Sequence, residues 1–458
     1  MNFPAVHYSD KVFRNVAVVH VVDLVEGLLD EILNQKPLGL LFIVPENESE
    51  KASALQELMD YYLNMPVYFL KETEDLKEIY GKLKSQVIGN KGRNSASTTF
   101  QLIVTDNEPV IEDVTEAAVL MGVFSENEFE MHSEKPIIVL SASYDSGSMA
   151  PGLNGDVNSA SGFMAMNDIA RSLRTLYDDR DLKDNSEFEM IFLLTPGASN
   201  DYELTSNFLQ SLNTKVSDRI QFVLCLDHLG SSADMTLHMG ATQNSEEAEQ
   251  FVRQTLKNLK SGVVDMGGSL KFQKKTKPGS FYEWEHLRYQ ENGFTAGTLT
   301  SLEKTEFSSR FEKFSLFDSK SSFNKKAYAR NVQAITEFLT RLVFRFPVDH
   351  VYSLTKDTVN MNRLENQLTF FGSTSRYLTS VTKGSNMLKE LVRLFSSHIG
   401  NVRTKFLRVV EPKFFKESPR YKMQILEDEW QYPGILPWFV FAGVIYGLYQ
   451  LWQAFKGK

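Results

Sequence analysis

The chain has 458 residues and a formal net charge of −9, from 49 Lys and Arg against 58 Asp and Glu. A hydrophobic fraction of 42% excludes an intrinsically disordered chain, which combines low hydrophobicity with high net charge. The acidic balance supplies no basic face for phosphate groups, so we expect no direct nucleic-acid partner. The one cysteine, Cys225, excludes an intramolecular disulfide and a thiolate zinc site.

The first hundred residues alternate between apolar runs and amphipathic segments. Continuous apolar strands separated by amphipathic helices indicate a largely parallel sheet covered on both faces. We expect strands at 16–22, 38–44, 66–70 and 98–105, and helices at 23–33, 51–63 and 74–83. The polar segment 84–98 is expected to be a loop.

The same alternation continues, more strongly, as far as residue 345. We expect strands at 136–141, 187–194, 219–226 and 294–299, and helices at 160–176, 201–212, 245–260 and 328–344. Residues 346–430 are mostly amphipathic and predict a helical stalk. The expected fold class is therefore α/β, with a mostly parallel sheet and helices on both faces. Its expected parts are an N-terminal α/β region at 1–107, a larger α/β domain at 108–345 and the stalk.

A run of 25 residues without Asp, Glu, Lys, Arg or His occupies positions 431–455. About 20 predominantly apolar residues are enough for a helix that crosses a bilayer. Aromatic residues flank the run, as is typical of the two headgroup levels, at Trp430, Tyr432, Tyr449 and Trp452. We therefore expect one transmembrane helix in contact with lipid, followed by a short tail at 456–458. A buried core helix is the alternative, but such helices seldom lack charge on every face.

Small residues line one face of this expected helix at Ala442, Gly443 and Gly447. Glycines four residues apart let a neighbouring helix approach closely, so we expect this face to contact another membrane helix.

The residues alone do not decide on which side of the membrane the bulk of the chain, residues 1 to about 430, lies. Four basic residues precede the run and two follow it, which favours a cytosolic bulk. The first residues show no basic region followed by an apolar one, so no signal peptide is visible. Asn47 begins a glycosylation sequon, which would be used only in a lumenal bulk. A tail-anchored cytosolic protein and a type I lumenal protein both remain.

Polar motifs follow three of the expected strands, where an α/β sheet places its chemistry. They are SASYDS at 141–146, GDVNSASG at 155–162 and LCLDHLG at 224–230. Their order and spacing are similar to those of the di-zinc aminopeptidases, which share a superfamily with the transferrin receptor and nicastrin. The resemblance covers about residues 136–344 and implies the fold of those enzymes.

The resemblance also implies where two zinc ions would bind, and most of those ligands are missing. Ser143 stands at the position of the first His, and Asn158 stands at the bridging Asp. The segment TPGAS at 195–199 replaces a Glu pair, and no His lies where the last ligand should fall. Only Asp227 of the ligand set remains, with Asp145 in the place of the residue that orients the opposite ligand. One carboxylate cannot hold zinc, so we expect no catalytic residue, no metal and no cofactor.

Asp145 and Asp227 are then expected to be polar caps at strand ends, hydrogen-bonded to nearby backbone. His228 follows Asp227 directly, and neighbours on a strand point to opposite faces, so we expect no shared site. Cys225 lies within an apolar strand, where a thiol is usually inert packing.

Further segments resemble one non-catalytic branch of this superfamily that has a single C-terminal span. They are PVYFLKETEDLKEIY at 66–80, FVLCLDHLG at 222–230, YEWEHLRY at 282–289, SLEK at 301–304 and RNVQAITEFLTRLVF at 330–344. The resemblance implies a type I protein of the endoplasmic reticulum membrane with a lumenal bulk, glycosylated at Asn47. It also implies three kinds of partner: the large lumenal protein NOMO, a small multi-spanning subunit, and the translocon for multi-pass membrane proteins, with the ribosome only indirectly. Members of that branch also affect receptor assembly.

Two other classes of function stay open. One is a nicastrin-like substrate receptor of an intramembrane protease complex. The other is an active metallo-aminopeptidase. Co-purifying membrane subunits would separate the first from the non-catalytic scaffold subunit that the resemblance implies, and metal analysis would test the second.

Overall fold

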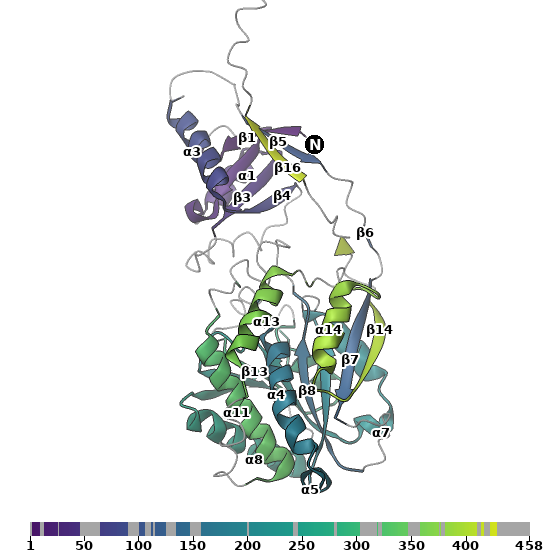
Figure 1. Ribbon diagram of the computed structural model, residues 1–458. Coiled ribbons are helices and arrows are strands. Elements are labelled where there is room, and N and C mark those ends of the chain that lie inside the picture. Colours follow the sequence, from purple (N-terminus) through teal and green to yellow (C-terminus); the bar gives the residue numbers. More distant parts are fainter. Residues whose placement is uncertain are drawn as a thin grey trace, which may run out of the picture. The chain divides into compact units, whose positions relative to one another are not determined.

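The computed structural model in Figure 1 divides into two compact units. The structure describes residues 2–9, 13–25, 27–45, 65–89, 100–105, 111–112, 115–124, 134–146, 157–198, 201–240, 246–278, 282–302, 318, 323–346, 358–374, 376, 381–409, 414–415 and 422–427. The first unit contains the described residues up to 105 together with 422–427, and the second unit contains those from 111 to 415. The second unit is therefore inserted into the first along the chain.

The first unit is built on a six-stranded sheet with the order β16-β5-β1-β2-β3-β4. Its strands are β1 (Asn2–His7), β2 (Val16–His20), β3 (Gly39–Val44), β4 (Val67–Lys71), β5 (Phe100–Thr105) and β16 (Lys422–Glu427). β1 to β4 pair in parallel, whereas β5 runs antiparallel to β1 and β16. The helices η1 (Val21–Asp23), α1 (Leu28–Asn34) and α3 (Glu74–Gly89) complete the described part. Tyr80 and Leu83 of α3 pack against Val18, Leu41 and Ile43 of the sheet.

The second unit is built on an eight-stranded sheet with the order β12-β11-β13-β10-β8-β9-β7-β14. Its strands are β7 (Thr115–Val123), β8 (Ile137–Ser143), β9 (Glu189–Thr195), β10 (Ile220–Asp227), β11 (Met235–Met239), β12 (Leu270–Lys274), β13 (Ala296–Thr300) and β14 (Asn401–Val409). The two-residue strands β6 (Ile111–Glu112) and β15 (Phe414–Phe415) pair separately.

The strand directions correct the expectation of a mostly parallel sheet. The neighbours β13, β10, β8 and β9 are parallel, but β7 pairs antiparallel with both β9 and β14, and β11 pairs antiparallel with β13. Both large sheets are therefore mixed. Antiparallel strands were missed because β7, β11, β14 and β16 gain their pairing from distant parts of the chain and not from a local pattern.

Helices cover both faces of this sheet, as expected. They are α4 (Ser161–Tyr177), α5 (Arg180–Asp184), α6 (Glu203–Gln210), α7 (Thr214–Ser217), α8 (Glu246–Asp265), α9 (His286–Glu291), α11 (Lys325–Phe344), α13 (Met361–Ser373) and α14 (Asn386–Ser396). Ile138 and Leu140 of β8 pack into a core with α4, α8, α11, α13 and α14, which share one face in Figure 1. Ile137 and Val139 point into a second core with α6 and α9. This alternation along β8 is the two-residue period of a strand buried on both sides.

The start of α4 packs directly against β10. A Cβ atom on Gly162 would lie 2.1 Å from the backbone oxygen of Leu226. Only glycine allows such a close approach of helix and strand. This contact sets α4, and the turn before it, against the end of β10.

The segment 346–430 differs from the predicted helical stalk. It contains α13 and α14, but Asn401–Val409 forms β14, paired along its whole length with β7. Lys422–Glu427 forms β16 and joins the sheet of the first unit. The segment thus supplies an edge strand to each large sheet.

The predicted transmembrane helix at 431–455 lies outside the described residues. So do the small residues Ala442, Gly443 and Gly447, and so does Asn47. Within the described ranges, no helix combines the length and apolar character needed to cross a membrane.

Candidate functional site

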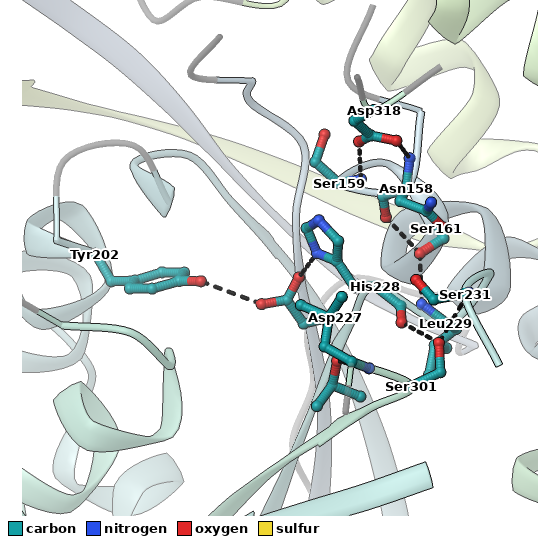
Figure 2. Close-up of polar contacts among 12 residues, drawn as sticks. Asn158, Ser159, Ser161, Tyr202, Asp227, His228, Leu229, Ser231, Ser301 and Asp318 are labelled. Atoms are coloured by element: carbon teal, nitrogen blue, oxygen red, sulfur yellow. Dashed lines mark hydrogen bonds and ion pairs between the residues drawn. The ribbon is translucent and has the colours of Figure 1, made fainter. Parts of the chain in front are cut away.

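The carboxyl ends of β8, β9 and β10 meet at one edge of the larger sheet. Ser143, the last residue of β8, pairs with Thr195, the last residue of β9, and β10 is parallel to β8. Figure 2 shows side chains from the turn before α4 gathering beside the end of β10. The structure thus brings to this edge the four positions that the sequence predicted, Ser143, Asp145, Asn158 and Asp227.

Asn158 is tied to the end of β10 through Ser161. The Ser161 hydroxyl donates to the Asn158 carbonyl at 2.5 Å and accepts from the backbone N–H of Leu229 at 2.7 Å. Both bonds are buried and follow from the close packing at Gly162. The turn before α4 is therefore fixed against the residues that follow β10.

Asp145 is committed to the backbone of the neighbouring strand end. Its side chain is 1% exposed, and Oδ1 accepts from the N–H groups of Gly197 at 2.9 Å and Ala198 at 3.0 Å. These amides belong to the segment that replaces the Glu pair of the zinc enzymes. Asp145 thus caps a strand end, as expected.

Asp227 and His228 lie side by side, and the prediction that they point apart is wrong. His228 has a positive φ of 48°, so the chain leaves the extended conformation immediately after β10. Its Nδ1 lies 2.6 Å from Oδ1 of Asp227, and the hydroxyl of Tyr202 donates to Oδ2 at 3.4 Å, as Figure 2 shows. Asp227 therefore contacts the side chains of both His228 and Tyr202.

Asp318 joins this edge and was missed by the sequence analysis. Its Oδ1 accepts from the N–H of Asn158 at 2.8 Å, and its Oδ2 accepts from the N–H of Ser159 at 3.1 Å. A carboxylate suits the amino end of a helix, where backbone N–H groups lack partners. Burial raises the pKa of Asp318, while the charge of His228 and these two N–H bonds oppose the rise.

Arg376 adds a buried cation beside the same groups. It is fully buried and donates to the carbonyl of Tyr144 at 2.9 Å, to that of Phe371 at 2.9 Å and to the Ser159 hydroxyl at 3.0 Å. Its positive charge also acts to lower the pKa of Asp318. An arginine between α13 and α14 thus supplies a fixed positive charge at this edge.

The residues of this strand-end cluster (Ser143, Asp145, Asn158, Asp227, His228 and Asp318) do not fit a pair of zinc ions. Two of its carboxylates already accept two backbone N–H groups each. Ser143 and Asn158 offer neutral oxygen where zinc sites use His nitrogen and carboxylate. In the part of the chain that the structure describes, no three His, Cys, Asp or Glu side chains are grouped to hold a metal ion.

Three buried atoms of the strand-end cluster have no hydrogen-bond partner among the described residues: Ser143 Oγ, Asn158 Oδ1 and His228 Nε2. An ordered water is the usual partner of such atoms.

A second polar cluster, also missed, lies beneath this edge around Glu285. The carboxyl of Glu285 is buried and accepts from Ser141 at 3.0 Å, Thr195 at 2.7 Å and Thr205 at 3.0 Å. Burial raises its pKa, and the three hydroxyl groups oppose the rise. Burial also raises the pKa of the Cys225 thiol, in keeping with the inert packing role expected for it. This cluster joins the segment before α9 to β8, β9 and α6.

Comparison with known proteins identifies two kinds of relative. Residues 127–339 match the model of peptidase family M28. BOS complex subunit NCLN of Rattus norvegicus is 22% identical over 86% of this chain and 74% of its own length. The subunit of Danio rerio is 25% identical over 86% of this chain and 75% of its own. The chain resembles nicalin. The resemblance expected from the sequence is therefore confirmed.

The solved structure of nicastrin, the gamma-secretase component, shares the fold. It superposes with a TM-score of 0.54, covering 84% of this chain and 78% of its own, at 10% sequence identity. A likeness at that identity concerns the fold alone. The nicalin resemblance rests on sequence over most of the chain.

Proposed function

We propose that this protein is a non-catalytic scaffold subunit of a membrane complex, the counterpart of the nicalin subunit of the BOS complex. The proposal rests on the hydrogen bonds that the carboxylates of the strand-end cluster make. Asp145 and Asp318, which could contribute charge to a metal site, are each occupied by two backbone N–H groups. The chain has the fold of a peptidase but lacks most of the metal-binding side chains of the zinc enzymes. This combination favours a role in binding partner proteins over a role in catalysis.

In this proposal the protein is a type I protein of the endoplasmic reticulum membrane with residues 1 to about 430 in the lumen. The transmembrane helix is at 431–455, and Asn47 carries a glycan. A NOMO-like lumenal protein and a small multi-spanning subunit are its partners at the translocon for multi-pass proteins, where it also supports receptor assembly. The relatives' name supports membership of a BOS-type complex, and the apolar run supports the transmembrane helix.

The fold suggests how such a scaffold is held at the bilayer. Glu427 ends β16, and the apolar run begins at Gln431, four residues later. Four residues span at most about 14 Å when fully extended. The sheet of the first unit is therefore tethered close to the membrane surface, and no long stalk separates them.

The proposal is tested by purifying the tagged full chain from membranes in mild detergent and identifying co-purifying subunits by mass spectrometry. A NOMO-like protein and a small multi-spanning subunit in stoichiometric amounts are the expected result. An intramembrane protease in their place would favour the nicastrin-like receptor instead. Recovery without any membrane partner would contradict both.

The double variant Gly443→Leu/Gly447→Leu tests the proposed contact within the membrane. Added apolar bulk should leave insertion intact but reduce recovery of the multi-spanning subunit, because it fills the small-residue face. Ile435→Leu, in the same run, is the matched control. Unchanged recovery with the double variant would exclude this face as the contact.

A further inference from the structure

Two neighbouring loops of the first unit leave large apolar side chains exposed. Phe13 lies just before β2 and is 57% exposed, and Leu38 lies just before β3 and is 39% exposed. The Arg14 N–H donates to the Lys36 carbonyl at 3.4 Å, which joins the two loops. A second bond between them runs from the Leu38 N–H to the Asn15 carbonyl at 2.9 Å. Because β2 and β3 are parallel neighbours, both apolar side chains lie at the edge of the sheet where these strands begin.

Arg14 and Lys36 place a positive charge on each of the same two loops. Both residues are exposed, and the Arg14 guanidinium lies 5.2 Å from the centre of the Phe13 ring. Among the described residues, no carboxylate forms an ion pair with either cation. We call these four residues, Phe13, Arg14, Lys36 and Leu38, the strand-start patch. Single exposed apolar residues are common, but here two adjoin and carry two cations with them.

The backbone holds both cations in the left-handed region. The φ angle is 58° at Arg14 and 54° at Lys36, a conformation that favours glycine. Lys36 is the second residue after α1, and its N–H donates to the Leu33 carbonyl at 2.9 Å. Glycine is the usual residue at this position of a helix end. Non-glycine residues in this region occur disproportionately at binding and catalytic sites, which gives a second reason to assign a function to the strand-start patch.

The direction of β16 favours a protein over the bilayer as the occupant of the strand-start patch. β1 and β16 are both antiparallel to β5, so β16 runs in the same direction as β1, β2 and β3. Glu427 therefore lies at the edge where these strands end, and the apolar run 431–455 follows from there. The patch lies at the opposite edge, about 17–20 Å away for strands of this length.

We propose that the strand-start patch binds an acidic segment of a partner protein that carries a large apolar side chain. The apolar side chain packs on Phe13 and Leu38, and its removal from water supplies most of the affinity. Flanking carboxylates pair with Lys36 and with Arg14, which offers a planar fork of N–H donors. The choice of a protein over a lipid surface rests on the proposed membrane helix, whereas the apolar and basic character of the patch does not.

The test places a photoreactive benzophenone side chain at Phe13 in the full chain and irradiates intact membranes. Mass spectrometry then identifies the crosslinked peptide after purification in denaturant. The expected peptide comes from another protein and carries Asp or Glu beside a large apolar residue. The same group at Val25, which is 64% exposed beyond the end of β2, is the control and should not yield that peptide. Crosslinks to lipid, to this chain or to a basic segment would overturn the proposal, as would the absence of any crosslink.

Arg14→Gly/Lys36→Gly separates binding from a structural role. Glycine suits the left-handed backbone at both positions, so the midpoint of urea unfolding should stay close to that of the wild type. The yield of the Phe13 crosslink should nevertheless drop about threefold or more, because two ion pairs are lost. Raised salt should lower the wild-type yield for the same reason. Lys84→Ala, which removes an exposed cation of α3, should change neither the midpoint nor the yield.

Leu38→Ser tests the apolar part of the patch in the same assay. It removes apolar surface from the contact, so the yield of the Phe13 crosslink should fall about fivefold or more. Unchanged yield in either this variant or the double glycine variant would overturn the assignment of the strand-start patch. The set of subunits that co-purify with the wild type would not be affected by that outcome, so the proposed function is tested separately.

Discussion

Asp168 makes the stability of the second unit depend on pH in a direction opposite to that of an ordinary surface carboxylate. It lies on α4 with a side chain that is 1% exposed, pairs with Arg363 and accepts from the Tyr328 hydroxyl at 3.3 Å. Burial raises its pKa from 3.8 to about 6, although Arg363 and Arg171 act to lower it. The desolvation of the carboxylate therefore outweighs both arginines.

The raised pKa of Asp168 determines the sign and the size of the pH dependence of stability. Between pH 4 and pH 6 the folded chain holds a proton on Asp168 that the unfolded chain has lost. Its stabilising contribution is therefore complete below about pH 4 and is lost as the pH rises through about 6. A shift of about two units corresponds to roughly 3 kcal/mol.

Replacing Asp168 with Asn removes the titration and keeps the shape. Urea unfolding is followed through Trp284, which is buried in the second unit, with the other three tryptophans changed to Phe in every variant. The free energy of unfolding of the wild type, relative to Asp168→Asn, should fall by about 3 kcal/mol between pH 4 and pH 7. The exposed Asp178→Asn is the control, whose offset should stay within about 0.5 kcal/mol. A flat difference for Asp168→Asn, or a wild type that gains stability with pH, would refute the reasoning.

Gly162→Ala should lower the free energy of unfolding by about 1–3 kcal/mol, because its Cβ meets the backbone of β10; Gly81→Ala, which has open space, should not destabilise the first unit. Arg376→Met should lower the free energy of unfolding, measured in urea, by about 3–5 kcal/mol. The substitution removes the buried hydrogen bonds of Arg376 together with the positive charge that acts on Asp318. A glycan at Asn47, released by endoglycosidase from the chain expressed in cells, is expected for a lumenal bulk, whereas digestion of the bulk by protease outside sealed microsomes would place it in the cytosol.

The central strands were predictable because each is a continuous apolar run. The expected strands 136–141, 187–194 and 219–226 correspond to β8, β9 and β10, shifted by only a few residues. Their order also placed the predicted polar residues at one edge of the sheet, since parallel strands end together.

The rest depended on contacts between distant residues. Asp318 lies 160 residues from its partner Asn158 in the sequence, and Arg376 lies 217 residues from its partner Ser159. The residues around Asp318 and Arg376 in the sequence do not predict that either side chain lies at the strand ends. β14 and β16 gain their strand pairing from partners far back in the chain. The contact between Asp227 and His228 depends on one left-handed residue, which a residue pattern does not reveal.

Zinc content distinguishes a non-catalytic scaffold from an active peptidase. The full chain is purified in the presence of zinc, freed of loosely bound metal by gel filtration, and measured by elemental analysis together with cleavage of aminoacyl substrates. The strand-end cluster predicts far less than one zinc per chain and no chelator-sensitive cleavage. Two zinc ions per chain with chelator-sensitive peptidase activity would contradict the account of a non-catalytic scaffold.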